Sequence, residues 1–302
     1  VWDSGKTESD RSVHVEMPGI ALSPRTRYYF RVQAWNRDGE PSGWSETAFW
    51  ETGMLRTSEW SAAWIAAPLS AGEPEPERSP LLRRVFAVRG PVASARIYAT
   101  ALGLYELELN GNRVGDSYFA PGWTSYRKRL QYQTYDVTDF LREGDNAIGA
   151  QLGNGWYKGN LAWQGHNNIY GDRRALLLEL HIAYKDGSRE VIVSDGSWKA
   201  DWGPILMSEI YHGETYDARL EQPGWSTAAF DDSSWLPVDI IEHGKDMLTA
   251  QENDPVRKIE EIRPVALITT PKGETVLDFG QNMVGWVKFS VQIGRASCRE
   301  RV

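Results

Sequence analysis

Side chains suited to binding a sugar are concentrated in one short stretch of the sequence. Between positions 154 and 172 the chain carries aromatic rings, amides, a histidine and a carboxylate. Saccharides present C–H faces to rings and hydroxyl pairs to amides and carboxylates, so this mixture suits carbohydrate recognition. The candidate binding residues are Asn154, Trp156, Tyr157, Trp163, His166, Asn167, Asn168 and Asp172. Trp156 and Tyr157 could equally be core residues.

Patterns typical of other chemistries are missing from the sequence. The histidines at positions 14, 166, 181, 212 and 243 lack the His-x3-His spacing of metal sites. His181 alternates with apolar neighbours in a strand pattern, and we expect it to face solvent. There is no G-x-S-x-G, P-loop or dinucleotide motif, and Gly153-Asn154-Gly155 is too short to cradle a phosphate. The residues themselves therefore predict no metal and no cofactor.

Charge and hydropathy exclude two classes of partner. The net charge is −8 and the basic residues are scattered, so we predict no binding to nucleic acid. No apolar run approaches the roughly 20 residues of a membrane helix, so we predict no membrane partner. Tryptophan (14) and tyrosine (13) outnumber phenylalanine (8), and we expect most of these rings to be core pillars of β-sandwiches.

Both ends of the sequence look truncated. The start, Val1-Trp2-Asp3-Ser4, lacks a Met and is not a signal peptide, so we expect the native chain to begin upstream. Residues 293–302 read IGRASCRERV, which back-translates to a common sequencing-library adapter. We expect this segment to be an artefact. Because it contains the only cysteine, Cys298, disulfides and cysteine chemistry are excluded elsewhere.

The elements that must position the candidate residues are strands. Polar and apolar residues alternate over 12–17, 28–34 and 104–109, which is typical of half-buried strands. Asn110-Gly111 and Lys185-Asp186-Gly187 predict hairpin turns, because these residues tolerate positive φ. One short helix is predicted over 139–142, with Thr138 as its cap and Gly144 at its end. The predicted fold class is all-β.

Residues 1–52 resemble the C-terminal half of a fibronectin type III domain. The pattern Leu22-x-Pro24-x-Thr26-x-Tyr28-x-Phe30-x-Val32-x-Ala34-x-Asn36 carries the resemblance. It makes Tyr28 the corner tyrosine, whose hydroxyl returns to the backbone a few residues upstream. With half of its sandwich missing, this part is expected to be poorly ordered by itself.

The remainder divides into several further segments. Residues 53–80 are predicted to be a connector pinned by Trp60 and Trp64, with the proline-rich, charged stretch 73–77 as a solvated linker. Residues 81–238 are predicted to form one antiparallel jelly-roll β-sandwich. A linker over 239–257 and the start of a second β-sandwich domain over 258–292 follow.

Three motifs resemble the N-terminal region of bacterial alpha-L-rhamnosidases when taken in order. They are Leu152-Gly153-Asn154-Gly155-Trp156-Tyr157-Lys158-Gly159, Gly213-Glu214-Thr215-Tyr216-Asp217-Ala218-Arg219 and Asp278-Phe279-Gly280-Gln281-Asn282-Met283-Val284-Gly285-Trp286. The patterns Leu109-Asn110-Gly111-x-x-Val114-Gly115 and Gly144-x-Asn146 also fit, although other glycosidase sandwiches share them. The resemblance covers nearly everything before residue 293.

The resemblance implies a multidomain glycosidase that releases terminal L-rhamnose from glycosides and polysaccharides with inversion. In this family the catalytic acid and base lie in a helical (alpha/alpha)6 barrel. An inverting pair needs carboxyls roughly 6.5–9.5 Å apart across the sugar. The sequence after residue 291 is too short to supply that barrel, so no catalytic residue is assigned. The implied partners are rhamnose-containing saccharides and the catalytic domain of the same chain.

The resemblance also bears on calcium and on two loops. Some sandwich modules of this type bind L-rhamnose through calcium, and Asn154, Asn167, Asn168 and Asp172 could supply oxygen ligands. In the second motif, Asp217 or Glu214 could pair with Arg219 and fix an irregular corner, with Gly213 at the bend. Alternatively, this loop lines a sugar site or docks against the barrel. The residues assigned to such a structural or docking role are Glu214, Tyr216, Asp217, Arg219, Gln281 and Asn282.

Two other classes of protein remain open. The chain could be a free-standing carbohydrate-binding protein, or an adhesion or scaffold protein of β-sandwich modules. The motif at Gly280-Gln281-Asn282 favours the glycosidase reading, because it begins a further domain that a simple lectin does not need.

Overall fold

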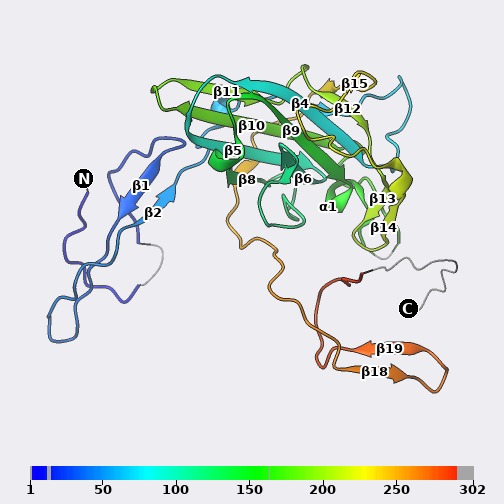
Figure 1. The fold of residues 1–302 in the computed structure, drawn as a ribbon. Helices are drawn as coiled ribbons and strands as arrows, with labels where there is room; N and C mark the ends of the chain where they lie inside the picture. The colour runs from blue at the N-terminus through cyan, green and yellow to red at the C-terminus, as the bar shows by residue number, and fades with distance from the viewer. Residues whose placement is uncertain (1, 12–14, 163, 291–302) are drawn as a thin grey trace. The chain divides into compact units, whose positions relative to one another are not determined.

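The computed structural model describes residues 2–11, 15–162 and 164–290. The chain divides into two compact units, Val1–Val256 and Arg257–Val302. The first unit contains a small two-stranded sheet and a large sandwich (Figure 1). No helix in the described part of the chain is long and apolar enough to span a membrane.

The two-stranded sheet confirms the tyrosine corner. Strand β1 (Arg27–Phe30) pairs antiparallel with β2 (Ala48–Glu51). The Tyr28 hydroxyl accepts a hydrogen bond from the Ser23 backbone N–H at 2.7 Å, and the ring stacks on Trp50 with centroids 4.7 Å apart. On the other face of the same strand, Tyr29 is 66% exposed. One face of this small sheet is therefore uncovered.

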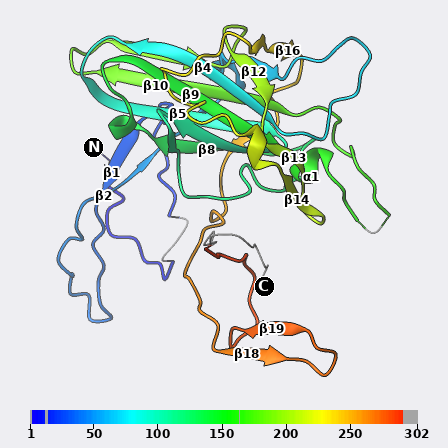
Figure 2. The same cartoon turned by 45° about the vertical axis from the view of Figure 1, so that its right-hand side comes forward.

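Two sheets form the sandwich. The seven-stranded sheet has the order β16-β3-β10-β5-β8-β17, with β11 paired to β10, and the six-stranded sheet has the order β15-β12-β4-β9-β6-β7. The first contains β3 (Trp64–Ala66), β5 (Val92–Leu102), β8 (Leu130–Asp136), β10 (Ala175–Tyr184), β11 (Arg189–Val193), β16 (Asp239–Ile241) and β17 (Leu248–Ala250). The second contains β4 (Pro80–Val88), β6 (Leu104–Leu109), β7 (Asn112–Arg113), β9 (Gly144–Gly153), β12 (Lys199–Trp202) and β15 (Leu236–Pro237). The long strands make up the body of the sandwich in both views (Figure 1, Figure 2).

The central strand β10 is buried on both faces. Leu176, Leu178 and Leu180 pack into the cluster between the two sheets, whereas Leu177 faces a second cluster rich in aromatic rings. Because successive side chains of a strand point to opposite faces, an apolar run of this kind needs cover on both sides. The second cluster supplies it with Trp60, Trp64, Tyr98, Tyr126 and Tyr132. Trp60 and Trp64, which were expected to pin one domain to the next, are both buried in this second cluster.

The predicted turns and the predicted helix have different outcomes. Asn110 and Gly111 adopt φ of 53° and 81° and join β6 to β7 as a two-residue hairpin, as predicted. The predicted helix over 139–142 is wrong: only a 3-10 turn, η2 (Thr138–Phe140), forms. The Thr138 hydroxyl does not cap a helix. It donates to Asp136 at 2.6 Å and accepts the Ala95 N–H at 3.0 Å, which ties the turn to β5.

Three further expectations require correction. The stretch 73–77 is not fully solvated, because Glu75 is buried. His181 does not simply face solvent: its Nε2 lies 2.7 Å from a Glu179 carboxylate oxygen and its ring meets Tyr98 edge-on. Part of the predicted linker 239–257 joins the sandwich, with β16 paired to β3 and β17 paired parallel to β8.

In the second unit, the described residues 257–290 form a hairpin. Strand β18 (Ala266–Thr269) pairs antiparallel with β19 (Thr275–Asp278). Gly280 adopts φ 75°, and its N–H donates to the Asp278 carboxylate at 2.8 Å. Gln281 and Asn282, which follow this turn, are exposed.

Candidate functional site

The first motif folds as a strand end and one helical turn. Strand β9 ends at Gly153 and α1 (Gly155–Lys158) begins two residues later. Gly155 adopts φ 54°, and a Cβ there would lie 2.6 Å from Leu104, so the turn requires glycine. This tight entry places the two adjacent rings of α1, Trp156 and Tyr157, in different environments.

Asn154 is buried at the base of this turn. Its exposed fraction is 1%, and its Nδ2 donates to Glu77 at 2.7 Å and to Glu209 at 2.9 Å. Glu209 also accepts the Asn160 N–H at 2.9 Å. Asn154 therefore holds the start of α1 against two other segments of the chain.

A buried ion pair lies next to this network. Arg174 Nε donates to Glu75 Oε2 at 3.0 Å, and both side chains are almost completely buried. Burial lowers the pKa of the Arg174 guanidinium, while the Glu75 carboxylate opposes that shift. Lys158 Nζ lies 3.5 Å from the same carboxylate. The final residue of α1 is thus turned inward, away from any surface ligand.

Three aromatic side chains gather on the surface beside α1. Trp156 stacks against Trp123 with centroids 5.9 Å apart and planes 7° apart, and Phe119 meets Trp156 edge-on at 6.0 Å. Trp123 is 55% exposed, Phe119 is 43% exposed and Trp156 is half-buried. We call Phe119, Trp123 and Trp156 the ring platform. Phe119 adopts φ 57°, a left-handed conformation that costs a residue of this kind about 1–2 kcal/mol.

Sequence reasoning singled out Trp156 but missed its two partners. Phe119 and Trp123 flank Ala120-Pro121-Gly122, and no strand alternation surrounds them. Aromatic residues in a proline-glycine turn lack the alternating pattern that would assign them to a strand facing the core. That missing pattern was the signal that could have marked them as surface candidates.

Tyr157 belongs to the core. It is 5% exposed, and its ring meets Tyr126 edge-on at 5.5 Å. Burial raises the pKa of Tyr157 to about 12, to which the Asp172 charge contributes. Of the two readings open for this residue, the structure supports core packing.

The polar members of the candidate set lie on an exposed loop beside α1. His166, Asn167, Asn168 and Asp172 are all exposed. The Asn168 N–H donates to the Lys158 carbonyl at 2.8 Å, which holds the loop to α1. Arg127 Nη2 donates to the Ile169 carbonyl at 2.8 Å, which holds it to the segment that carries Trp123. Trp163 lies outside the described residues.

The oxygen-bearing calcium candidates lie in different environments. Asn154 is buried, and its amide nitrogen donates to Glu77 and Glu209, whereas Asn167, Asn168 and Asp172 are exposed. Within the described residues no group of three or more His, Cys, Asp or Glu could hold a metal ion.

The second motif forms strand β14 (Gly213–Tyr216), paired with β13 (Ile205–Glu209), and the turn η3 (Ala218–Leu220). Arg219 donates to both carboxylate oxygens of Asp217, at 2.8 and 2.6 Å, and these hydrogen bonds lower the pKa of Asp217. Glu214 is not the partner. Burial, with the Glu106 charge, raises its pKa. The Tyr216 hydroxyl donates to Glu221 at 2.7 Å.

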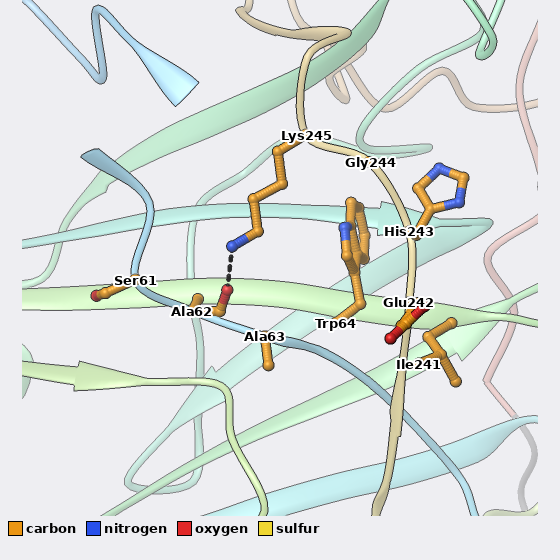
Figure 3. A pocket seen from close by; sticks show the side chains of 9 residues that line it. All are labelled: Ser61, Ala62, Ala63, Trp64, Ile241, Glu242, His243, Gly244 and Lys245. Carbon is orange, nitrogen blue, oxygen red and sulfur yellow. Dashed lines mark hydrogen bonds between the residues drawn. The ribbon is translucent and has the colours of Figure 1, made fainter. Parts of the chain in front are cut away.

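A cavity of about 590 Å³ lies elsewhere in the first unit, between residues 61–64 and 241–245 (Figure 3). Trp64 and His243 meet edge-on at 5.4 Å, and Lys245 donates to the Ala62 carbonyl. Burial lowers the pKa of His243. None of the candidate binding residues lines this cavity.

Three family models match the chain in order. Residues 1–56 match a Rha78A-like, N-terminal immunoglobulin domain, residues 90–260 match the alpha-L-rhamnosidase N-terminal domain, and residues 268–297 match a bacterial alpha-L-rhamnosidase concanavalin-like domain. The all-β fold class and the resemblance to rhamnosidase N-terminal regions are thereby confirmed.

Solved structures and a curated relative agree with these matches. The structure of an alpha-L-rhamnosidase from Aspergillus terreus is similar with a TM-score of 0.85 and 43% identity, over 93% of this chain and 33% of that chain. The Streptomyces avermitilis alpha-L-rhamnosidase complexed with L-rhamnose has a TM-score of 0.81 and 30% identity, over 93% of this chain and 44% of that chain. An alpha-L-rhamnosidase of Formosa agariphila is 37% identical over 94% of this chain.

The chain spans only part of the length of these relatives. It covers 32% of the Formosa agariphila protein and 44% of the Streptomyces avermitilis protein. The central family model alone covers more than half of the chain. The chain therefore belongs to the alpha-L-rhamnosidase family, of which it carries the N-terminal domain.

Proposed function

We propose that this chain is the accessory, non-catalytic part of an inverting alpha-L-rhamnosidase that removes terminal L-rhamnose from glycosides or polysaccharides. The observation that carries the proposal is the ordered match of three rhamnosidase domain models along one chain. The catalytic acid and base are supplied by a helical barrel outside these 302 residues. In support, the only α-helix of the described residues is the four-residue α1, which cannot contribute to such a barrel.

This part of the enzyme binds the saccharide substrate and provides the scaffold against which the separate catalytic domain docks. The exposed polar loop of His166, Asn167, Asn168 and Asp172, next to Trp156, supports a role in recognising rhamnose-containing glycosides. Sugar hydroxyls suit its amides and carboxylate, and the adjacent ring suits a C–H face. A related protein that has been solved in complex with L-rhamnose supports the same class of ligand.

The Glu214 to Arg219 corner and the turn before Gln281 fix the geometry of the accessory domains and dock the barrel. The bidentate Asp217–Arg219 pair supports the structural part of this role. Its guanidinium is largely exposed, with 88% of the side-chain surface accessible, so it remains open to a docking partner. Gln281 and Asn282 are exposed in the same way.

The test is hydrolysis of 4-nitrophenyl alpha-L-rhamnopyranoside by the purified 302-residue chain. We expect no release of 4-nitrophenol above the rate of a heat-denatured sample, because no inverting carboxyl pair is assigned to this part. Turnover by the pure chain would overturn the proposal that its domains are non-catalytic.

A further inference from the structure

The ring platform differs from the other aromatic groups of the sandwich in its exposure. Tyr126, Tyr132 and Tyr157 are each at most 5% exposed and fill the second core cluster. Trp123 is 55% exposed, although it lies in the same region and stacks on Trp156. A large ring held parallel to its neighbour with much of its surface in water contributes little to the core.

The platform is held in place by contacts that do not use its exposed surface. Trp156 is fixed by α1, which the Gly155 turn and the Asn154 network anchor. Trp123 is fixed on one side by its parallel stack with Trp156. Arg127, four residues along the chain, ties the same segment to the polar loop through the Ile169 carbonyl. The platform therefore presents a preformed ring surface to a ligand.

The polar groups near the platform suit a neutral ligand. Lys158 is turned inward against Glu75, and the Arg127 guanidinium donates to a backbone carbonyl. The exposed groups on the adjacent loop are two amides, an imidazole and the Asp172 carboxylate. Such groups suit neutral hydroxyls, and a flat ring surface suits the C–H face of a sugar.

We propose that the Trp123 face of the ring platform is a stacking subsite for a neutral pyranose, with the 166–172 loop binding its hydroxyls. The proposal rests on the proposed role of this chain in recognising rhamnose-containing glycosides and assigns that role to rings from a separate segment, 119–123. Trp123 is the principal contact. Trp156 stacks on the opposite face of the Trp123 ring and positions it.

The test is a calorimetric titration of the 302-residue chain with methyl alpha-L-rhamnopyranoside, which has no aromatic aglycone. Trp123→Ala should weaken binding about fivefold or more, from the loss of the stacked ring. Trp123→Tyr should retain most of the affinity. Trp44→Ala is the matched control, because Trp44 is also 55% exposed but lies in the fibronectin-like part, and it should change nothing. An unchanged thermal midpoint for Trp123→Ala would show that folding is intact.

Three results would count against the proposal, each in a distinguishable way. If the wild type binds and Trp123→Ala binds equally well, the platform is not the subsite, while the recognition role stands. If only 4-nitrophenyl alpha-L-rhamnopyranoside binds and the methyl glycoside does not, the platform recognises an aromatic group and the pyranose assignment fails. If the wild type binds neither glycoside, both the subsite and the recognition role fail.

Discussion

Glu75 and Arg174 form an ion pair in which both side chains are at most 1% exposed, although the two residues are 99 positions apart. The guanidinium also donates to the backbone carbonyls of Pro76 and Arg78, at 2.7 and 2.8 Å. A charged, proline-rich segment is thereby fixed to the start of the central strand β10. The connector is consequently a structural part of the sandwich.

Removing the carboxylate should destabilise the domain strongly. Glu75→Gln leaves the Arg174 charge buried without its partner, which typically costs about 3–5 kcal/mol. Urea unfolding followed by tryptophan fluorescence measures the loss. Glu73→Gln is the control, since Glu73 lies two residues away and is exposed. Equal stability of the two variants would contradict a structural role for the pair.

Packing around strand β9 leaves no room for a side chain at Gly149. A Cβ there would lie 2.3 Å from the Trp225 ring, which covers the outer face of the six-stranded sheet. Gly149→Ala should therefore cost about 1–3 kcal/mol in unfolding free energy. Gly90→Ala is the control, because nothing lies within 4 Å of its Cβ position and its φ is not in the left-handed range. A thermal midpoint of Gly149→Ala equal to that of the control would show that Trp225 does not pack as described.

His243 should make the stability of the domain sensitive to mild acid. Burial lowers its pKa below the ordinary value of 6.5, so the folded state favours the neutral ring. The unfolded state takes up a proton first as the pH falls below 6.5, and stability is lost from there down through the folded pKa. His243→Gln should show a shallower fall in thermal midpoint between pH 7.5 and 5.5 than the wild type. The exposed His212→Gln variant should keep the wild-type slope, and identical slopes for all three proteins would refute the assignment.

The tyrosine corner should control local opening of the fibronectin-like part. Tyr28→Phe removes the acceptor of the Ser23 N–H, a loss of about 1 kcal/mol or roughly fivefold in local opening. Amide hydrogen exchange at Ser23 should accelerate by that factor. Tyr29→Phe alters the opposite, exposed side of the strand and should leave the exchange unchanged. Acceleration in both variants would mean that the hydroxyl is not the cause.

Local chemistry explains which features were predictable from the sequence. The Asn110-Gly111 hairpin and the Tyr28 corner depend on residues at most five positions apart, and both were predicted. The Glu75–Arg174 pair and the stacking of Trp123 on Trp156 depend on the tertiary fold, and no local pattern indicates them. The proline-rich, charged composition of residues 73–77 therefore led to the wrong prediction that Glu75 is exposed to solvent.

The candidate site shows the same limit within one motif. Trp156 and Tyr157 are adjacent and both aromatic, yet one is half-buried at the surface and the other belongs to the core. The two side chains differ only because the single helical turn α1 points them in different directions. Asn154 was chosen for its hydrogen-bonding groups, but its amide nitrogen donates to Glu77 and Glu209 instead.

We infer that these domains serve a rhamnosidase whose acid and base lie in another part of the protein. The most direct measurement expresses the full genomic reading frame that contains this chain and follows methyl alpha-L-rhamnopyranoside hydrolysis by NMR. We expect the full protein, unlike the 302-residue chain, to release L-rhamnose with the β-anomer formed first. A full reading frame without a helical barrel, or a full protein that leaves rhamnosides intact, would contradict it.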